Sequence, residues 1–530
     1  MFRSIQLPRK SGRWSTLVVI VAAGLLAGAN ELVRAGVDVV PADPNDWPMY
    51  NHDPEGTRHN FAEDILSPAT VGDLEVKWTY ETAAPVAGSP AVVKDRIYAA
   101  DATGAVHALD RDGNLLWQTA LDVGPTLTDM KVTASPLVTN RTVVIGDLSG
   151  RVHGLDVQSG AVKWTTTPNP HPFGAIWGSP TMVGNHVAIG TSSNEWVVAS
   201  VPGYPCCTFR GSLAVLDPAN GDIVWQTFTI SEEENAAGAS GAPIWSTPTY
   251  DRATKTIYAT TGNNYSQPTT GNSDSFIALD ATTGEIKWVN QRTAGDEWTL
   301  AFGDSSPNHP DFDIGDSPQI YKIDGRKVVS AGQKSGFFHV LDAATGEDVN
   351  SPIQLAPSGT VGGLFADSAY ADGVVYANGT DWPHPFSGEV PNKGILSAVA
   401  ADGSQELWRF ETPFSPNISG VAVANGVVYF QSSFDGQFYA LDATTGELLA
   451  QIATGGTSSG PAVSRGQIYL GTGDATFNAI DPSFPIGPGA IVALGLASEQ
   501  ALSAAVPEPS AFVLLALCVP LIANRQQKTK

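Results

Sequence analysis

The chain has 530 residues and a formal net charge of −24 at neutral pH, with 53 acidic residues against 29 lysines and arginines. A chain this acidic is poorly suited to bind nucleic acid or an anionic membrane surface, because both carry negative charge. Its 54 glycines and 37 prolines punctuate segments rich in Val, Ile, Tyr and Trp, which is typical of a β-rich fold with many turns.

Residues 1–29 have the pattern of a secretory signal peptide. A basic start with Arg3 and Arg9 precedes the apolar run 17–26, and the small residues 27–29 follow. A charged, an apolar and a small-residue region in this order are typical of a cleaved export signal and not of a membrane-spanning helix. We therefore expect an exported protein.

A short phrase returns along the chain and indicates a repeat architecture. An apolar pair and an Asp are followed by a polar turn that closes on Gly, and then by a strand that usually ends in Trp. The copies lie at residues 108–117, 154–164, 215–225, 278–288, 340–349, 399–408 and 440–450. Period-two segments rich in Val, Ile and Tyr precede the copies, so each unit is predicted to be a meander of short antiparallel strands. The recurring Asp residues are interpreted as turn residues and not as catalytic ones.

The units begin near residues 85, 131, 176, 244, 312, 360, 418 and 457, which gives eight of them. A four-stranded sheet repeated radially forms a β-propeller, whose ring closure protects the strand edges. The last unit ends near Asp481 without its Trp-bearing strand, whereas Leu74–Trp78 is such a strand without partners. We therefore predict an all-β, eight-bladed β-propeller over residues 45–482, with the ring closed by an N-terminal strand.

The C-terminal part is predicted to be a linker and a sorting segment. Residues 483–505 are rich in Gly, Ala and Ser, as in flexible linkers. Residues 506–530 join a Pro-Glu-Pro core to the apolar run 511–523 and a basic end, and they resemble the PEP-CTERM sorting signal. The resemblance implies a dedicated processing enzyme as a partner, and a location in the periplasm, at the cell surface or in the extracellular matrix of a Gram-negative-type bacterium. A plain membrane anchor is the alternative, although this run is short for a bilayer.

Glu195, Asn263 and Asp296 lie in widened segments between strands, outside the repeat-building positions. Two carboxylates and an amide oxygen on one rim would form an oxygen-rich site of the kind that suits Ca²⁺. The alternative is that each residue bonds to its own loop, as Asn and Asp commonly do. Lys334 adds a cation from the next unit.

These segments resemble the pyrroloquinoline-quinone (PQQ)-dependent alcohol dehydrogenases, which are eight-bladed quinoproteins. The matching features in chain order are Glu195 followed by Arg210-Gly211, Trp245 before strands that end in Gly262-Asn263, Asp296-Glu297-Trp298, and Lys334-Ser335-Gly336-Phe337-Phe338. The opening at residues 47–53 and the phrase at residues 205–211 are similar to the polyvinyl-alcohol dehydrogenase branch. The resemblance covers roughly residues 45–482.

The resemblance implies a role for each matched residue. Glu195, Asn263 and Asp296 are expected to bind Ca²⁺, and Asp296 is also the expected general base. Trp245 is expected to stack on the quinone. Lys334 is expected to donate to the quinone oxygens, and Arg210 is placed among the cofactor-binding residues.

The implied activity is that of an exported PQQ- and Ca²⁺-dependent dehydrogenase. It would oxidise an alcohol to a carbonyl, with the secondary alcohols of a polymer such as polyvinyl alcohol as one option, and pass the electrons to an external acceptor such as a cytochrome c. Cys206-Cys207 follows Glu195, whereas the family's vicinal pair precedes that Glu, so no cofactor role is assigned to it; an exported setting permits a disulfide. A non-catalytic propeller scaffold of the outer-membrane assembly type, and a member that has lost its cofactor, are the alternatives.

Overall fold

The computed structural model describes residues 39–40, 43–473 and 487–497. The predicted signal peptide (1–29) and sorting segment (506–530) lie outside these residues. No helix in the described part of the chain is long and apolar enough to cross a membrane.

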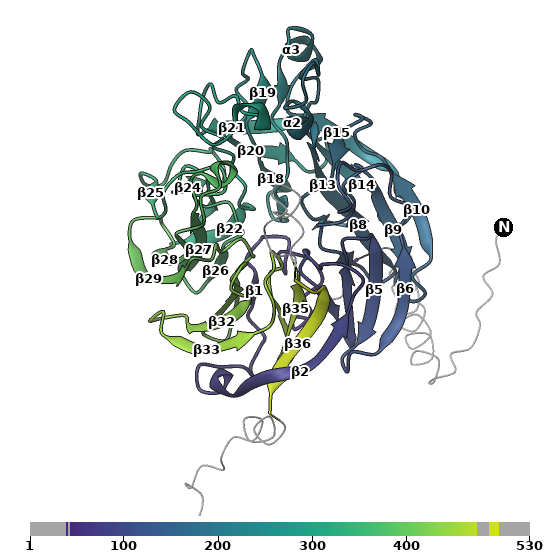
Figure 1. The fold of residues 1–530 in the computed structure, drawn as a ribbon, viewed down its shortest axis with the longest axis vertical. Helices are drawn as coiled ribbons and strands as arrows, with labels where there is room; N and C mark the ends of the chain where they lie inside the picture. Colours follow the sequence, from purple (N-terminus) through teal and green to yellow (C-terminus); the bar gives the residue numbers. More distant parts are fainter. Residues whose placement is uncertain (1–38, 41–42, 474–486, 498–530) are drawn as a thin grey trace, which may run out of the picture.

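Eight antiparallel sheets surround a central axis, which confirms the predicted eight-bladed β-propeller (Figure 1). The first four blades are β3 (Ala91–Val93), β4 (Arg96–Ala100), β5 (Ala105–Asp110) and β6 (Leu115–Ala120); β7 (Leu137–Val138), β8 (Thr142–Gly146), β9 (Val152–Asp156) and β10 (Val162–Thr166); β12 (Thr181–Val183), β13 (His186–Ser193), β14 (Ser212–Leu216) and β15 (Ile223–Phe228); and β17 (Thr249–Asp251), β18 (Thr256–Thr260), β20 (Ser275–Asp280) and β21 (Ile286–Gln291). The next three are β22 (Gln319–Ile323), β23 (Arg326–Gly332), β24 (Phe337–Asp342) and β25 (Ile353–Gln354); β26 (Ala369–Ala371), β27 (Val374–Asp381), β28 (Lys393–Ala400) and β29 (Glu406–Pro413); and β30 (Ala422–Ala424), β31 (Val427–Gln431), β32 (Gln437–Asp442) and β33 (Leu448–Ala453).

The eighth blade combines the two ends of the described chain. It contains β34 (Ala462–Ser464), β35 (Gln467–Thr472), β36 (Ala490–Leu496) and β2 (Leu74–Glu81). Strand β2 pairs antiparallel with β36, with Leu74 opposite Leu496 and Glu81 opposite Ala490. The predicted closure by an N-terminal strand is therefore confirmed.

The predicted boundary at residue 482 is wrong. Strand β36 lies inside residues 483–505, which the composition had suggested to be a linker, and all seven of its residues are buried. Its Gly and Ala residues fit here because the strand is covered on both sides, by β35 and by β2. The propeller thus extends at least to Leu496.

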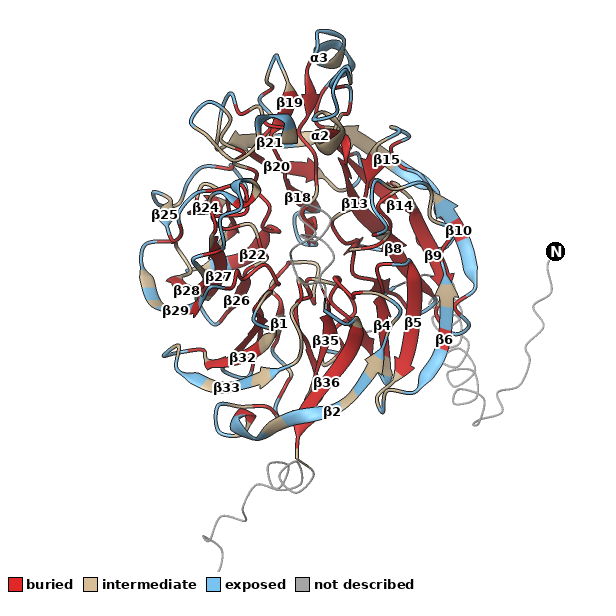
Figure 2. Ribbon diagram, viewed as in Figure 1, coloured by how far each residue is buried: buried red, intermediate tan, exposed pale blue. Residues whose placement is uncertain are grey.

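Further short elements decorate the blades. They are β1 (His59–Asn60), β11 (Gly174–Ala175), β16 (Ser240–Gly241), β19 (Asn264–Ser266), the helices α2 (Glu195–Val198) and α3 (Glu232–Ala236), and the 3₁₀ turns η1 (Val71–Asp73), η2 (Leu300–Phe302) and η3 (Pro385–Ser387). Burial decreases outward along each blade, so that outer strands such as β6 and β10 are partly exposed whereas the inner strands are buried (Figure 2).

The repeated Trp and Gly connect one blade to the next. Each Trp donates its indole N–H to a backbone carbonyl of the following blade, and its ring covers the Gly of that blade's turn. The contacts are those of Trp78 with Arg111 and Gly113, Trp117 with Val157 and Gly160, Trp164 with Pro218 and Gly221, Trp225 with Ala281 and Gly284, Trp288 with Ala343 and Gly346, and Trp408 with Ala443 and Gly446. The repeated phrase therefore has a packing role, because a β-carbon on the turn Gly would collide with the ring; at Gly160 it would lie 2.4 Å from Trp117.

Residues 45–60 form a belt around the axis, inside the ring of blades. The belt bonds to the innermost strands in succession, through Trp47 to Val92, Pro48 to Val138, Pro54 to Tyr250, Glu55 to Ile320, Thr57 to Tyr370, Arg58 to Val423 and Asn60 to Val463. Arg58 is fully buried and donates to the carbonyls of Val421 and Tyr50. The belt thereby satisfies backbone groups that the inner strands would otherwise leave unpaired.

Candidate active site

A cavity of about 450 Å³ is lined by loops that run from the first blade to the sixth. Its volume lies within the range of small-molecule and cofactor sites. Three of the predicted site residues line it, namely Trp245, Asn263 and Lys334. The structure therefore brings together residues that lie up to 89 positions apart in the sequence (245 to 334).

Trp245 supplies a flat apolar wall to the cavity. It lies in the loop that leads into β17, and the ammonium nitrogen of Lys334 is 5.7 Å from the centroid of its ring. Gly315 packs directly against the edge of the indole on the protein side. A planar aromatic cofactor fits such a wall, since stacking needs an apolar face of similar size.

Two carboxylates that the sequence reading missed, Asp311 and Asp313, also line the cavity. The Nζ of Lys334 lies 3.1 Å from Asp311 Oδ1 and 3.1 Å from Asp313 Oδ2. Asp311 adopts a φ of 56°, which is uncommon for a residue other than glycine. The signal in the sequence was the pair of acidic residues Asp311 and Asp313 in the widened segment between β21 and β22.

The charges in this cluster shift each other's pKa values. Burial raises the pKa of Asp311 well above its ordinary range, and the carboxylates of Asp313 and Asp296 raise it further, whereas Lys334 lowers it. Burial alone would lower the pKa of Lys334, but Asp311 and Asp313 outweigh this effect and raise it. Lys334 therefore remains protonated and offers a positive charge to the cavity.

Asn263 connects the carboxylates to the neighbouring loop. Its backbone N–H donates to Asp313 Oδ1 at 2.6 Å, and its side-chain N–H donates to the carbonyl of Trp298 at 2.7 Å. The side-chain amino group also donates to the carbonyl of Asn264, and these side-chain bonds leave the amide oxygen free to accept. Asn263 thus retains the oxygen that a hard cation would need.

Asp296 lies behind the cavity wall and is absent from its lining. Its Oδ2 accepts from the backbone N–H of Phe312 at 2.7 Å, and Phe312 is the residue between Asp311 and Asp313. Burial raises the pKa of Asp296 to about 6, although the bond from Phe312 opposes the shift. The geometry therefore makes Asp296 a support for the Asp-Phe-Asp segment.

Several buried carboxylate oxygens of this region have no hydrogen-bond partner among the described residues. They are both oxygens of Asp274, Oδ1 of Asp296 and Oδ2 of Asp311. Burial, followed by the charges of Asp296, Asp313 and Asp311, raises the pKa of Asp274 well above its ordinary range. A cation fits this excess of negative charge, since Lys334 is the one basic side chain of the described chain that bonds to the cluster. The described residues hold no cluster of three or more His, Cys, Asp or Glu side chains in metal-binding arrangement.

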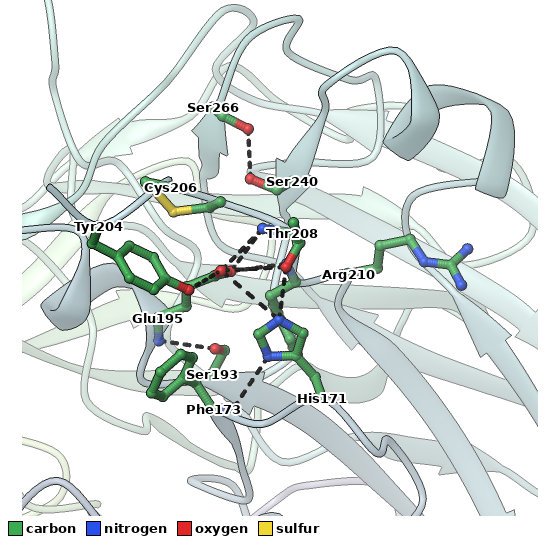
Figure 3. A network of polar contacts seen from close by, with 12 residues as sticks. His171, Phe173, Ser193, Glu195, Tyr204, Cys206, Thr208, Arg210, Ser240 and Ser266 are labelled. Carbon is green, nitrogen blue, oxygen red and sulfur yellow. Dashed lines mark hydrogen bonds and ion pairs between the residues drawn. A yellow bond between two sulfur atoms is a disulfide. The ribbon is translucent and has the colours of Figure 1, made fainter.

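Glu195 is absent from the cavity lining. It anchors the loop of the two cysteines through the contacts drawn in Figure 3. Its carboxylate accepts from the backbone N–H groups of Thr208 at 3.0 Å and Phe209 at 2.8 Å, and from the hydroxyl of Tyr204 at 2.7 Å. Cys206 and Cys207 are joined by a disulfide within the same loop. The carboxylate is fully buried, and its bonds are those of a loop anchor.

Arg210 also points away from the cavity. It donates to the carbonyl of Ile230 at 3.3 Å, and its guanidinium carbon lies 4.1 Å from the ring centroid of Phe228. In Figure 3 its side chain extends to the opposite side from Glu195. The structure therefore does not bring Arg210 together with Trp245 and Lys334.

The comparisons with known proteins show that this propeller is similar to those of the quinoprotein dehydrogenases. The sequence model described as "Glucose/ethanol/alcohol dehydrogenase, beta-propeller domain" matches residues 178–363, the part of the chain that contains Trp245, Asn263, Asp311, Asp313 and Lys334. The model described as "Outer membrane protein assembly factor BamB" matches residues 72–203 and 392–483, which contain blade repeats without these residues.

Individual relatives point to the same class of enzyme. A polyvinylalcohol dehydrogenase of Sphingopyxis sp. is 29% identical over 81% of this chain and 73% of its own length. A quinohemoprotein alcohol dehydrogenase of Comamonas testosteroni is 25% identical over 82% of this chain and 72% of its own length. The crystal structure of the Comamonas testosteroni quinohemoprotein alcohol dehydrogenase has the same fold, with a TM-score of 0.68, 22% identity and coverage of 88% of this chain and 82% of that one. This chain is thus an enzyme related to the PQQ-dependent alcohol dehydrogenases.

Proposed function

We propose that this protein is an exported PQQ- and Ca²⁺-dependent dehydrogenase that oxidises an alcohol, including the secondary alcohols of a polymer such as polyvinyl alcohol, to a carbonyl. The observation that carries the proposal is Lys334 between Asp311 and Asp313 beside the indole of Trp245, all in one cavity. A propeller that served only as a scaffold would not need a buried cluster of this charge, because burying unpaired carboxylates is costly.

In this proposal Trp245 would hold PQQ by stacking, and Lys334 would donate to the oxygens of PQQ. When bound, PQQ would supply the two-electron acceptor, and the cation would supply the charge that polarises it. An external acceptor such as a cytochrome c is the expected partner for the electrons. Gly315 packs against the edge of the Trp245 ring and fixes the position of this wall.

Asp311 is the best-placed general base. Its Oδ1 bonds to Lys334, whereas its Oδ2 is buried without a partner among the described residues and is free to accept the proton of an alcohol hydroxyl. Lys334 and a bound cation both favour the ionised form of Asp311, which a base requires. Asp296, the base predicted from the sequence, is proposed instead to hold the Asp-Phe-Asp segment through Phe312.

The cation ligands proposed from the geometry are Asn263, Asp311 and Asp313, which all line the cavity. These side chains offer amide and carboxylate oxygens, which suit a hard cation such as Ca²⁺. Binding of the cation by Glu195 and Asp296 stays a prediction from the resemblance, and Glu195 could take part only by giving up its bonds to Thr208 and Phe209.

The test is reconstitution of the purified protein with PQQ and Ca²⁺. We expect quenching of tryptophan fluorescence by PQQ that depends on Ca²⁺, and dye-linked oxidation of 2-butanol and of polyvinyl alcohol. Absence of PQQ binding at micromolar concentrations would overturn the proposal and favour a propeller scaffold. PQQ binding without Ca²⁺ dependence would overturn the choice of cation alone.

A further inference from the structure

The outer wall of the cavity carries an aromatic strip, formed by Trp196, Trp298 and Phe386. The ring centroids of Trp196 and Trp298 are 5.6 Å apart, and those of Trp298 and Phe386 are 6.4 Å apart with an angle of 19° between the planes. The three residues come from α2, from the segment before η2 and from η3. The strip is therefore assembled from three separate loops and is no part of a blade core.

Asp304 holds the strip together. Its Oδ1 accepts from the backbone N–H of Phe386 at 2.9 Å, and its Oδ2 accepts from the hydroxyl of Ser387. On the other side of the same loop, the indole N–H of Trp298 donates to the carbonyl of Gly303 at 3.0 Å. The loop that carries Trp298 thus also fixes the position of Phe386.

The aromatic strip continues into an apolar rim. Leu127 lines the cavity with 47% of its surface exposed, and Leu300 is half-buried beside Trp298. These two side chains extend the apolar surface that the aromatic strip offers to an occupant of the cavity. The polar groups, by contrast, are gathered around Lys334. An occupant would therefore place a hydroxyl near Lys334 and apolar carbons along the strip.

We propose that the substrate is an acyclic chain alcohol, whose reacting carbinol lies near Asp311 while several further carbons of the chain lie across Trp196, Trp298 and Phe386. The C–H faces of an extended polyalcohol would contact the rings, and its other hydroxyls would remain in water. This inference rests on the proposed function, because it assigns the substrate of that site. Asp304 acts as a positioning residue, since it touches the strip and not the substrate.

The first test compares Trp196→Ala and Phe386→Ala with the wild type on polyvinyl alcohol and on 2-butanol. We expect the ratio of kcat/KM for the polymer to kcat/KM for 2-butanol to fall about 10- to 100-fold, as for the loss of a buried aromatic contact. Phe61→Ala is the matched control, because Phe61 is 70% exposed and does not line the cavity. An unchanged ratio in both strip variants would overturn the proposal.

The second test measures binding without PQQ. Polyvinyl alcohol is titrated into the cofactor-free protein, and binding is followed by intrinsic fluorescence and by retardation in a polymer-containing native gel. We expect binding in the wild type and in Phe61→Ala, and a loss of at least about tenfold in affinity in Phe386→Ala. Polymer binding in this assay, combined with no turnover after reconstitution with PQQ and Ca²⁺, would support the strip and overturn the proposed dehydrogenase activity. Turnover of 2-butanol by the reconstituted protein, combined with no polymer binding, would overturn the role of the strip. Equal binding of a soluble glucan would also overturn the proposal, since the strip would then not distinguish an acyclic chain from pyranose rings.

The third test addresses Asp304. Asp304→Ala is expected to lower the ratio of kcat/KM for the polymer to kcat/KM for 2-butanol, as Phe386→Ala does. The change should lie mainly in KM for the polymer, because the ring of Phe386 loses its support. Asp304→Asn keeps an acceptor for the N–H of Phe386 and should restore most of the ratio. A loss of kcat on both substrates in Asp304→Ala, with no rescue by Asn, would overturn the positioning role.

Discussion

Gly315 lies so close to Trp245 that a β-carbon at residue 315 would be 2.1 Å from Cη2 of the indole. No pair of carbon atoms packs at that distance, so the ring can hold its place only while residue 315 is glycine. The backbone at Gly315, which contacts the edge of the indole, thus positions the Trp245 wall that is proposed to hold the quinone.

Gly315→Ala is therefore expected to displace Trp245 and to weaken PQQ binding by about 10- to 100-fold, in line with the cost of overpacking. The measurement is the PQQ titration followed by tryptophan quenching, with circular dichroism as a check of the fold. Gly271→Ala is the control, because a β-carbon at residue 271 would meet nothing within 4 Å. Equal PQQ affinity in both variants would contradict the stacking role of Trp245.

Asp311→Asn is expected to lower kcat by about 100-fold or more, the usual effect of losing a general base. Asp296→Asn should reduce it less, because Asn keeps an oxygen that can accept from the N–H of Phe312. Steady-state kinetics at saturating PQQ and Ca²⁺ distinguish the two residues. A larger loss in Asp296→Asn would restore Asp296 as the base.

Sequence reading predicted the blades well because each depends on local signals, such as period-two alternation and the Trp and Gly that contact across neighbouring blades. It placed Trp245, Asn263 and Lys334 near one another by resemblance, and all three line the cavity. It missed Asp311, whose side chain reaches the cavity through an uncommon backbone conformation that no pattern encodes. It also mistook β36 for a linker. The Gly and Ala content of this segment is typical of linkers, and its place between β2 and β35 becomes evident only in the folded structure.

Glu195→Gln is expected to destabilise the fold by about 1–3 kcal/mol, because the amide group would bring a donor against the N–H groups of Thr208 and Phe209. Thermal unfolding without PQQ measures this effect. Glu233→Gln, on the exposed face of α3, is the control. An unchanged melting temperature together with weaker Ca²⁺ binding would instead support Glu195 as a cation ligand.

Stability is expected to depend on pH through Asp316. Burial and the neighbouring Asp367 raise the pKa of Asp316 to about 8, although the bond from the Ser368 hydroxyl opposes this. The folded state therefore keeps a proton that the unfolded chain releases near its ordinary pKa of about 4. Between these values stability falls as the pH rises, by up to about 1.4 kcal/mol per pH unit.

Urea unfolding of the wild type and of Asp316→Asn between pH 5 and pH 8 checks this expectation. The Asn side chain does not titrate, so the difference in free energy of unfolding between the two proteins should change steadily across the range. A constant difference would show that Asp316 is ionised throughout.

The belt of residues 45–60 sets a limit on the order in which the protein can be completed. The ribosome makes this segment before any blade, yet its hydrogen-bond partners extend from Val92 in the first blade to Val463 in the eighth. Strand β2 is likewise synthesised early, and its antiparallel partner β36 follows only near the end of the chain. Early blades can form as they emerge, but the ring and its axis take their final form only after almost the whole chain has been synthesised. A chain interrupted before β36 would therefore leave β2 unpaired, and a chain interrupted before Val463 would also leave the belt without its last hydrogen-bond partner.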